Sequence, residues 1–455
     1  MNDTSRPEYE QLERTQRRLV YVLLGIIALA SLTARIASVR SQDRLTPFLS
    51  ANDRSRWCTI HSLVDYGTYE IDAVIARRGW NTIDKVRHKN SAGEPKFYSS
   101  KPPLFPTLVA GPYWLLQRLT GANLADDTFF VARVLLVLTN VVPLALYLAV
   151  MFALIEAWGG SHAGKIFAAA CASFATFVTT FGVTLNNHVP AAIGLALSVA
   201  ALLMIARGRE PAGRWYALCG LASAWTASNE LPALSWLVCA AGLCWLYSPR
   251  QTLLWFLPGA LVVALPVFGL NYWVHDSLKP PYMHRTEGDN WYEYEGSYWS
   301  DGVRKGVDRG EPSPAVYAVQ TLVGHHGIFS LTPIWIMALL GIRRSLQHSE
   351  RVVQWLTWAT LAMTAVCWIF YITRPLIDRN YGGVSCGFRW MFWFTPLWLI
   401  LMLPTADRWL VNSRTRWLAW GCLAVSVFST HYASLNPWVH PWLYRYWETL
   451  GWIQG

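Results

Sequence analysis

The sequence predicts an all-α polytopic membrane protein that crosses the bilayer about eleven times. Three observations lead to this fold class. Only 15% of the 455 residues are charged, whereas a soluble domain carries roughly 25%. Apolar residues make up 53% of the chain and gather in runs long enough to span a bilayer. The chain also holds 26 tryptophans, a residue enriched where membrane meets water.

The first predicted span covers about 19–38, after a polar N-terminal stretch. It lacks a small-residue cleavage site and is long for a signal peptide, so we expect the mature protein to retain it. Further apolar runs lie at 129–156, 166–184, 189–206, 215–229, 232–247, 252–274, 315–342, 354–373, 389–405 and 416–432. Neither an internal repeat nor a separate soluble domain is visible, which predicts one integral membrane domain over 1–455.

One more apolar stretch, at 103–119, is short and interrupted by prolines and glycines. If it does not cross, every short basic loop falls on one side, as the positive-inside rule requires. These loops carry Arg14, Arg17, Arg18, Lys165, Arg207, Arg209, Arg214, Arg250, Arg343, Arg344, Arg351, Arg408, Arg414 and Arg416. We therefore expect a cytoplasmic N-terminus and a re-entrant or interfacial helix at 103–119. Such a helix survives only beside protein or a wet cavity.

This topology places the larger segments 39–128, 275–314 and 374–388 on the outer face. In a bacterium that face of the inner membrane is periplasmic, which is where we expect the active site. The net charge of +10 resides in the short loops, so it does not indicate a nucleic-acid partner. Six of the eight cysteines lie in apolar runs, and no Cys or His spacing is typical of a metal site. We expect no metal and no other cofactor.

Two charged residues of the first outer segment are candidates for chemistry. Asp53 stands where a helix begins, just beyond the first span. It is either an N-cap, whose carboxylate accepts backbone N–H bonds, or a general base at the membrane surface. Lys101 stands where the 103–119 helix begins. Its ammonium either reaches toward the interface or holds a phosphate as a point charge.

Arg389 opens a late apolar run, where an arginine is costly unless it is paired or wet. It is a candidate for a phosphate, although contact with lipid headgroups would also explain it. Arg374 and Arg379 nearby are secondary candidates on the same outer segment.

The 275–314 segment alternates acids with aromatics, a pattern suited to sugar rings and hydroxyls and equally to an interfacial aromatic belt. Polar residues also end several spans on the outer side, where they either line a cavity or simply cap the helices. The candidate sugar- or acceptor-binding residues are Glu293, Tyr294, Trp299, Glu230 and His326, with Asn229 and Asn186-Asn187-His188 as further polar span ends.

Several of these landmarks occur in an order that resembles the C-type membrane glycosyltransferases (GT-C). Asp53, Arg56, Trp57 and Ile60 are followed by Lys101-Pro102-Pro103-Leu104-Phe105. Two later stretches also look familiar: 325–333, which begins His325-His326-Gly327, and 381–390, which ends Gly387-Phe388-Arg389-Trp390. The pattern is similar to the protein O-mannosyltransferases and the lipid A aminoarabinose transferases.

The resemblance implies transfer of a sugar, with inversion, from a polyprenyl phosphate to an acceptor on the outer face. It implies that Asp53 is the catalytic base and that Lys101, Arg389 and Arg56 bind the donor phosphate. Family members commonly carry Asp-Glu where this chain has Asp53-Arg54, and this departure leaves metal binding and the acceptor open.

A transporter or flippase of a lipid-linked substrate is the main alternative. Such proteins usually place polar residues near mid-span and show internal repeats, whereas here the polar candidates cluster at one face. A structural membrane subunit would leave Asp53 and Lys101 unexplained. The identity of the sugar and of the acceptor, whether lipid, glycan or protein, cannot be read from the residues.

Overall fold

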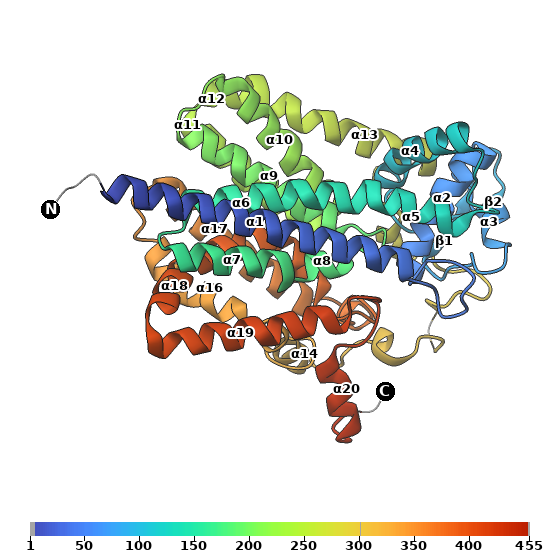
Figure 1. The fold of residues 1–455 in the computed structure, drawn as a ribbon. Coiled ribbons are helices and arrows are strands. Elements are labelled where there is room, and N and C mark those ends of the chain that lie inside the picture. Colours follow the sequence, from blue (N-terminus) through green and yellow to red (C-terminus); the bar gives the residue numbers. More distant parts are fainter. Residues whose placement is uncertain (1–4, 301, 454–455) are drawn as a thin grey trace.

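The computed structural model describes residues 5–300 and 302–453 and is mostly helical. Long helices lie side by side in one bundle (Figure 1). The N-terminal end of α1 (Ser5–Ser38) lies at one end of this bundle. The first outer segment folds at the opposite end, as α2 (Ala51–Tyr66), α3 (Asp72–Ile75), β1 (Lys85–Lys89), β2 (Pro95–Ser99) and α4 (Leu104–Thr120).

Six helical segments in the described part of the chain are long and apolar enough to cross a membrane. They are Glu10–Ser38, Thr128–Trp158, His162–Phe181, His188–Ala206, Pro249–His275 and Arg351–Ile372. They contain α1, α5 (Thr128–Leu136), α6 (Val142–Trp158), α7 (His162–Phe174), α8 (Phe177–Phe181), α9 (His188–Ala206), α12 (Pro249–Gln251), α13 (Leu257–His275) and α17 (Arg351–Ile372). The fold therefore fits an integral membrane protein.

The other predicted spans also contain helices, although each falls short in length or hydropathy. They are α10 (Ala212–Asn229), α11 (Leu234–Tyr247), α18 (Thr395–Val411) and α19 (Ser413–Tyr432), with the amphipathic α20 (Trp442–Thr449) after them. The count of eleven crossings therefore stays a prediction.

The predicted run at 315–342 is wrong as one continuous helix. It divides into α14 (Pro314–Leu322), α15 (Ile328–Leu331) and α16 (Ile334–Ser345). The breaks coincide with Gly324, Gly327 and Pro333. Proline lacks the N–H that an interior helix position needs. A Cβ on Gly324 would lie 2.7 Å from Cα of Gln320, so this position has no room for a side chain.

The expectation of an all-α chain is also wrong in the outer segments. β1 and β2 form an antiparallel hairpin in which Val86 pairs with Tyr98, and a two-residue pair joins β3 (Arg285–Thr286) to β4 (Asp289–Asn290). The Arg87 N–H donates to the Trp291 carbonyl at 2.8 Å, which ties the two outer segments together. Short alternating strands in a polar loop give a much weaker sequence signal than apolar helices.

Ion pairs connect residues in and beside the short loops, at the end of the bundle where α1 begins. Glu156 pairs with Arg17 at 2.8 Å and with Lys165 at 3.5 Å, and Arg207 pairs with Glu350 at 2.8 Å. These loops lie together with the start of α1 (Figure 1). The basic loops thus lie at one end of the bundle, as the charge argument predicts. The same argument predicts that this end is cytoplasmic.

The helix predicted at 103–119 is α4, which packs along α2 at the outer end (Figure 1). The hydroxyl of Tyr113 and the amide of Gln117 both donate to Asp65 of α2, each at 2.7 Å. Pro112 lies inside the helix. The second half of α4 is thereby joined to the C-terminal end of α2.

We expect a cysteine placed at Ala122, after α4, to react with a membrane-impermeant thiol reagent from the outer side only. The reason is the distribution of basic loops, which puts all of 39–128 outside. The native cysteines are buried or half-buried, so background labelling should be low. A cysteine at exposed Arg414 is the matched control and should react from the cytoplasmic side. Labelling of the Ala122 position from the cytoplasmic side alone would contradict this topology.

Candidate functional site

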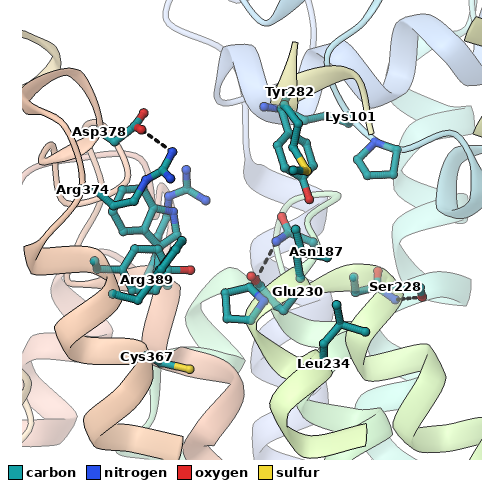
Figure 2. A pocket seen from close by; sticks show the side chains of 18 of the residues that line it. Lys101, Asn187, Ser228, Glu230, Leu234, Tyr282, Cys367, Arg374, Asp378 and Arg389 are labelled. Carbon is teal, nitrogen blue, oxygen red and sulfur yellow. Dashed lines mark hydrogen bonds and ion pairs between the residues drawn. The ribbon is translucent and has the colours of Figure 1, made fainter. Parts of the chain in front are cut away.

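A cavity of about 990 Å³ lies among the outer ends of α2, α4, α10, α11 and α17 and the segments 282–286 and 374–390. In Figure 2, Arg374, Arg389 and Asp378 occupy one wall and Lys101 and Tyr282 the facing wall, with Glu230 and Asn187 between them. Five cations and two carboxylates line it: Arg56, Lys101, Arg285, Arg374 and Arg389, with Glu230 and Asp378. The cavity walls are therefore rich in positive charge.

Arg56 is held by neutral oxygen atoms. Its guanidinium donates to the Asn52 carbonyl at 3.0 Å, to the Asn52 side chain, and to Oδ1 of Asn187 at 2.8 Å. The residue is only 4% exposed. Burial lowers the pKa of Arg56 to about 10, which leaves the guanidinium charged at neutral pH.

Arg389 is fixed in a similar way by neutral groups. Its Nε donates to the Gly382 carbonyl at 2.7 Å, and Nη1 donates to Nε2 of His188 at 2.9 Å. The guanidinium carbon lies 5.1 Å from the ring centre of Trp438. Gly382 has φ +92°, and a Cβ there would meet Nε of Arg389 at 2.5 Å, so glycine is required.

Within the described residues, neither Arg56 nor Arg389 has a carboxylate within ion-pair distance. Buried charges are normally paired, because transfer of an ion out of water costs several kcal/mol. Two guanidiniums that face one cavity and contact only neutral groups therefore indicate an anion-binding site.

Lys101 differs because it has a carboxylate partner. Its Nζ lies 2.9 Å from Oδ2 of Asp84, just before β1. Burial lowers the pKa of Lys101 to about 8, even though Asp84 opposes that shift. Asp84 was missed from the sequence, because a single acid before a short strand has no distinguishing pattern.

Asp378 joins two further cavity cations. It lies 2.5 Å from Nη2 of Arg374 and 3.7 Å from Nη1 of Arg285. The Arg285 guanidinium carbon also lies 4.1 Å from the Tyr292 ring centre. Arg285 and Asp378 were missed, although both stand in segments that the topology placed outside. Arg379 was a secondary candidate, and its guanidinium instead donates to the carbonyls of 311, 312 and 374.

Glu230 is the carboxylate in the centre of the cavity wall. It ends α10 and is 5% exposed. Oε1 accepts from Nδ2 of Asn187 at 2.6 Å and contacts Nδ1 of His188. Oε2 makes no hydrogen bond to any residue that the structure describes. Glu230 therefore offers one free carboxylate oxygen beside the unpaired arginines.

Asp53 lies next to the cavity and does not line it. Oδ1 accepts from the indole N–H of Trp57 at 2.8 Å and from the Leu185 N–H at 3.1 Å, and Oδ2 accepts from the Leu49 N–H at 3.1 Å. Burial raises the pKa of Asp53 to about 6. The N-cap of α2 is Ser50, so Asp53 occupies the third helical position and is not the cap.

Asp53 thereby joins the start of α2 to the turn at 182–187 that precedes α9. Buried amides hold the same turn: Nδ2 of Asn140 donates to the carbonyls of Gly182 and Thr184, both at 2.8 Å. Oδ1 of Asn186 accepts from the N–H of His188 at 2.9 Å. These bonds fix the backbone beneath Asn187 and His188.

Of the predicted site residues, Lys101, Arg389, Arg56 and Glu230 line one cavity. Arg374, Asn187 and Asn229, the secondary candidates, line it as well. The other sugar- or acceptor-binding candidates, Glu293, Tyr294, Trp299 and His326, do not. Glu293 is exposed and Tyr294 packs against Phe97 at 5.1 Å between ring centres. The Trp299 indole donates to the Ile83 carbonyl at 2.8 Å. His326 stacks on Tyr381 with ring centres 4.3 Å apart.

No group of three or more His, Cys, Asp or Glu side chains in the described residues converges in a way that could hold a metal ion. The carboxylate of Asp53, the sequence candidate nearest to the cavity, accepts three N–H bonds. The expected absence of a metal stays a prediction.

By sequence, the chain matches no family model and no curated protein. By structure, it is similar to the oligosaccharyltransferase of Archaeoglobus fulgidus. The structure of that protein with Zn and sulfate aligns with 95% of this chain and 55% of its own, at a TM-score of 0.50 and 11% identity.

Two further structures of the same archaeal protein are also similar. One is tethered to an acceptor peptide (TM-score 0.49, 12% identity, 95% of this chain and 57% of that one). The other is in complex with an inhibitory peptide and a dolichol-phosphate (TM-score 0.46, 11% identity, 96% and 58%). The chain thus spans little more than half the length of these structures. It shares the fold of this archaeal oligosaccharyltransferase.

Proposed function

We propose that this protein is an inverting glycosyltransferase that moves a sugar from a polyprenyl phosphate to an acceptor on the outer face. The observation that carries the proposal is the pair of arginines, buried Arg56 and half-buried Arg389, that face one cavity without a carboxylate partner among the described residues. A phosphate supplies the missing negative charge. The archaeal protein of the same fold was solved with sulfate, which is also an anion.

The apolar side of the cavity suits a lipid tail. Leu231 and Leu234 line it near the start of α11, and Val366 and Phe370 line it on α17. These four side chains are also 39%, 46%, 61% and 46% exposed on the surface of the protein. A cavity that joins buried cations to exposed apolar side chains matches a molecule with a phosphate head and a hydrocarbon tail.

The chemistry follows from these positions. The acceptor attacks the anomeric carbon, and Oε2 of Glu230 takes the proton that the acceptor loses. The bond from the anomeric carbon to the phosphate oxygen breaks, and polyprenyl phosphate leaves with one additional negative charge. Arg56, Arg389 and Lys101 stabilise that charge in a site with little water.

The direct test uses the purified protein in nanodiscs with a panel of undecaprenyl phosphates that carry different radiolabelled sugars. We expect one donor to lose its sugar to a membrane acceptor and to release undecaprenyl phosphate. A flippase is the competing function. Movement of an intact lipid-linked sugar across proteoliposomes, with no bond cleaved for any donor, would overturn the proposal.

We propose the periplasmic side of a bacterial inner membrane as the location of the site. The distribution of basic loops supports it, because the cavity lies at the end of the bundle opposite those loops.

We expect Asp53 to hold the neighbouring backbone in place rather than to accept the acceptor's proton. Asp53→Asn places an amide where Oδ2 accepts the Leu49 N–H, which loses one buried bond and costs about 1–3 kcal/mol. We expect a lower melting temperature and a modest fall in transfer per folded molecule. If the variant melts normally and loses about 100-fold or more of its transfer, Asp53 is the general base instead.

Binding of undecaprenyl phosphate, the leaving product, should depend on pH through Lys101. Its ammonium, with a pKa of about 8, is charged at pH 7 and mostly neutral at pH 9. A phosphate monoester stays fully ionised over this range, since its second pKa is about 6. We expect undecaprenyl phosphate to bind about ten-fold more weakly at pH 9 than at pH 7, because one charged contact is lost. Lys101→Arg should remove the dependence, and a flat wild-type profile would contradict it.

A further inference from the structure

The contacts of His188 determine which ring nitrogen carries its proton. A guanidinium can only donate, so Nε2 of His188 accepts from Arg389 and bears no hydrogen. A neutral imidazole carries one N–H, which is therefore on Nδ1. That N–H points to Oε1 of Glu230. The direction of donation thus runs from Arg389 through His188 to Glu230.

The neighbouring residue makes a second connection with the same direction. Arg56 donates to Oδ1 of Asn187, and Nδ2 of Asn187 donates to Oε1 of Glu230. Both unpaired arginines therefore reach the same carboxylate oxygen through two adjacent residues. Oε1 thus has two partners, whereas Oε2 makes no hydrogen bond to a described residue.

The surroundings of His188 hold its ring in one orientation. The residue is 1% exposed. Its ring centre lies 5.2 Å from that of Phe181 and 6.3 Å from that of Phe392, both in edge-on arrangements. The imidazole is thus enclosed by aromatic side chains from α8 and from the segment 389–394. A ring flip would replace both nitrogens with ring carbons and break both contacts.

We propose that His188 and Asn187 are positioning residues that couple the phosphate-binding arginines to the carboxylate of Glu230. The inference rests on the proposed function and deepens it. When Glu230 takes the acceptor proton, the negative charge that both arginines feel through this connection disappears. Arg56 and Arg389 then attract the leaving phosphate more strongly. Coupling of this kind is reciprocal, so a bound phosphate also changes the electrostatic surroundings of Glu230.

Two substitutions at His188 separate its two contacts. The amide of Asn lies near the position of Nδ1, so His188→Asn keeps a donor for Glu230 and removes the acceptor for Arg389. The amide of Gln lies near Nε2, so His188→Gln keeps the acceptor for Arg389 and removes the donor for Glu230. The variants are similar in polarity and differ in which partner they lose.

The probe is undecaprenyl phosphate, with binding measured in nanodiscs. We expect His188→Asn to bind it about 10-fold to 100-fold more weakly, the range for loss of one hydrogen bond to a charged group. His188→Gln should bind within about two-fold of the wild type, because Arg389 keeps its acceptor. Equal weakening in both variants would show a merely structural role and overturn the proposal.

A spectroscopic measurement tests the direction of donation independently. The protein is labelled with ¹⁵N-histidine, and the His188 signals are assigned by their loss in His188→Gln. We expect one protonated nitrogen, Nδ1, and one bare nitrogen, Nε2, whose signal shifts when undecaprenyl phosphate is added. A proton on Nε2, or no shift despite measured binding, would overturn the coupling. Absence of undecaprenyl phosphate binding by the wild type would remove the proposed function instead, while the tautomer would still decide the direction of donation.

Discussion

Glu230→Gln is expected to lower sugar transfer by at least about 100-fold, the loss typical of a missing general base. Glutamine keeps the size of the side chain, and its carbonyl oxygen still accepts from Asn187 and His188. Its amide nitrogen then occupies the place of Oε2 and cannot take a proton. The fold should therefore remain near normal, and undecaprenyl phosphate should bind at least as tightly as it does to the wild type, while turnover falls.

The measurement compares transfer with binding for the same preparation of protein. Glu295→Gln, on an exposed part of the outer segment, is the matched control and should behave as wild type. Near-normal transfer by a well-folded Glu230→Gln variant would exclude Glu230 as the base. A similar loss of binding and transfer would show that Glu230 acts by holding the cavity together.

Arg389→Gln is expected to weaken undecaprenyl phosphate binding about 30-fold or more, because loss of a charge from a buried, hydrogen-bonded charge pair costs roughly 2–5 kcal/mol. The variant also leaves Nε2 of His188 and the Gly382 carbonyl with a weaker donor. Because the interaction is buried, added salt should weaken it less than it weakens a surface contact.

The control for charge is Arg414→Gln, an exposed arginine at the other end of the bundle. It removes the same formal charge and should leave binding unchanged. Weakening of similar size in both variants would mean that net charge, rather than the cavity, attracts the phosphate. Unchanged binding in Arg389→Gln would contradict the placement of the donor phosphate beside this residue.

The sequence predicted the helices well wherever a long apolar run forms a helix alone. The run at 189–206 became α9 almost residue for residue. The prediction failed where two local signals competed. At 315–342 the mean hydropathy suited one helix, whereas Gly324, Gly327 and Pro333 interrupt it. The strands were missed because their stability comes from pairing across a hairpin, which no single short segment displays.

The site was predicted in part, for a similar reason. Lys101 and Arg389 stand out because a cation beside an apolar run is rarely placed there without a partner. Asp84 and Asp378 give no such signal, since acids are ordinary in polar loops. The free oxygen of Glu230 and the three N–H donors around Asp53 depend on how turns far apart in sequence meet. By residue type alone, Asp53 was the first candidate for the catalytic base. Only the geometry distinguishes its carboxylate from that of Glu230.

The exposed apolar side chains that line the cavity limit which part of a donor the protein can recognise. Leu234 and Val366 line the cavity and are 46% and 61% exposed, which we interpret as an opening on its apolar side. A tail that leaves through such an opening continues into the surrounding bilayer. Recognition then stops a few carbons beyond the phosphate. Donors with short and long isoprenoid chains should therefore be interchangeable, and selectivity should reside in the headgroup alone.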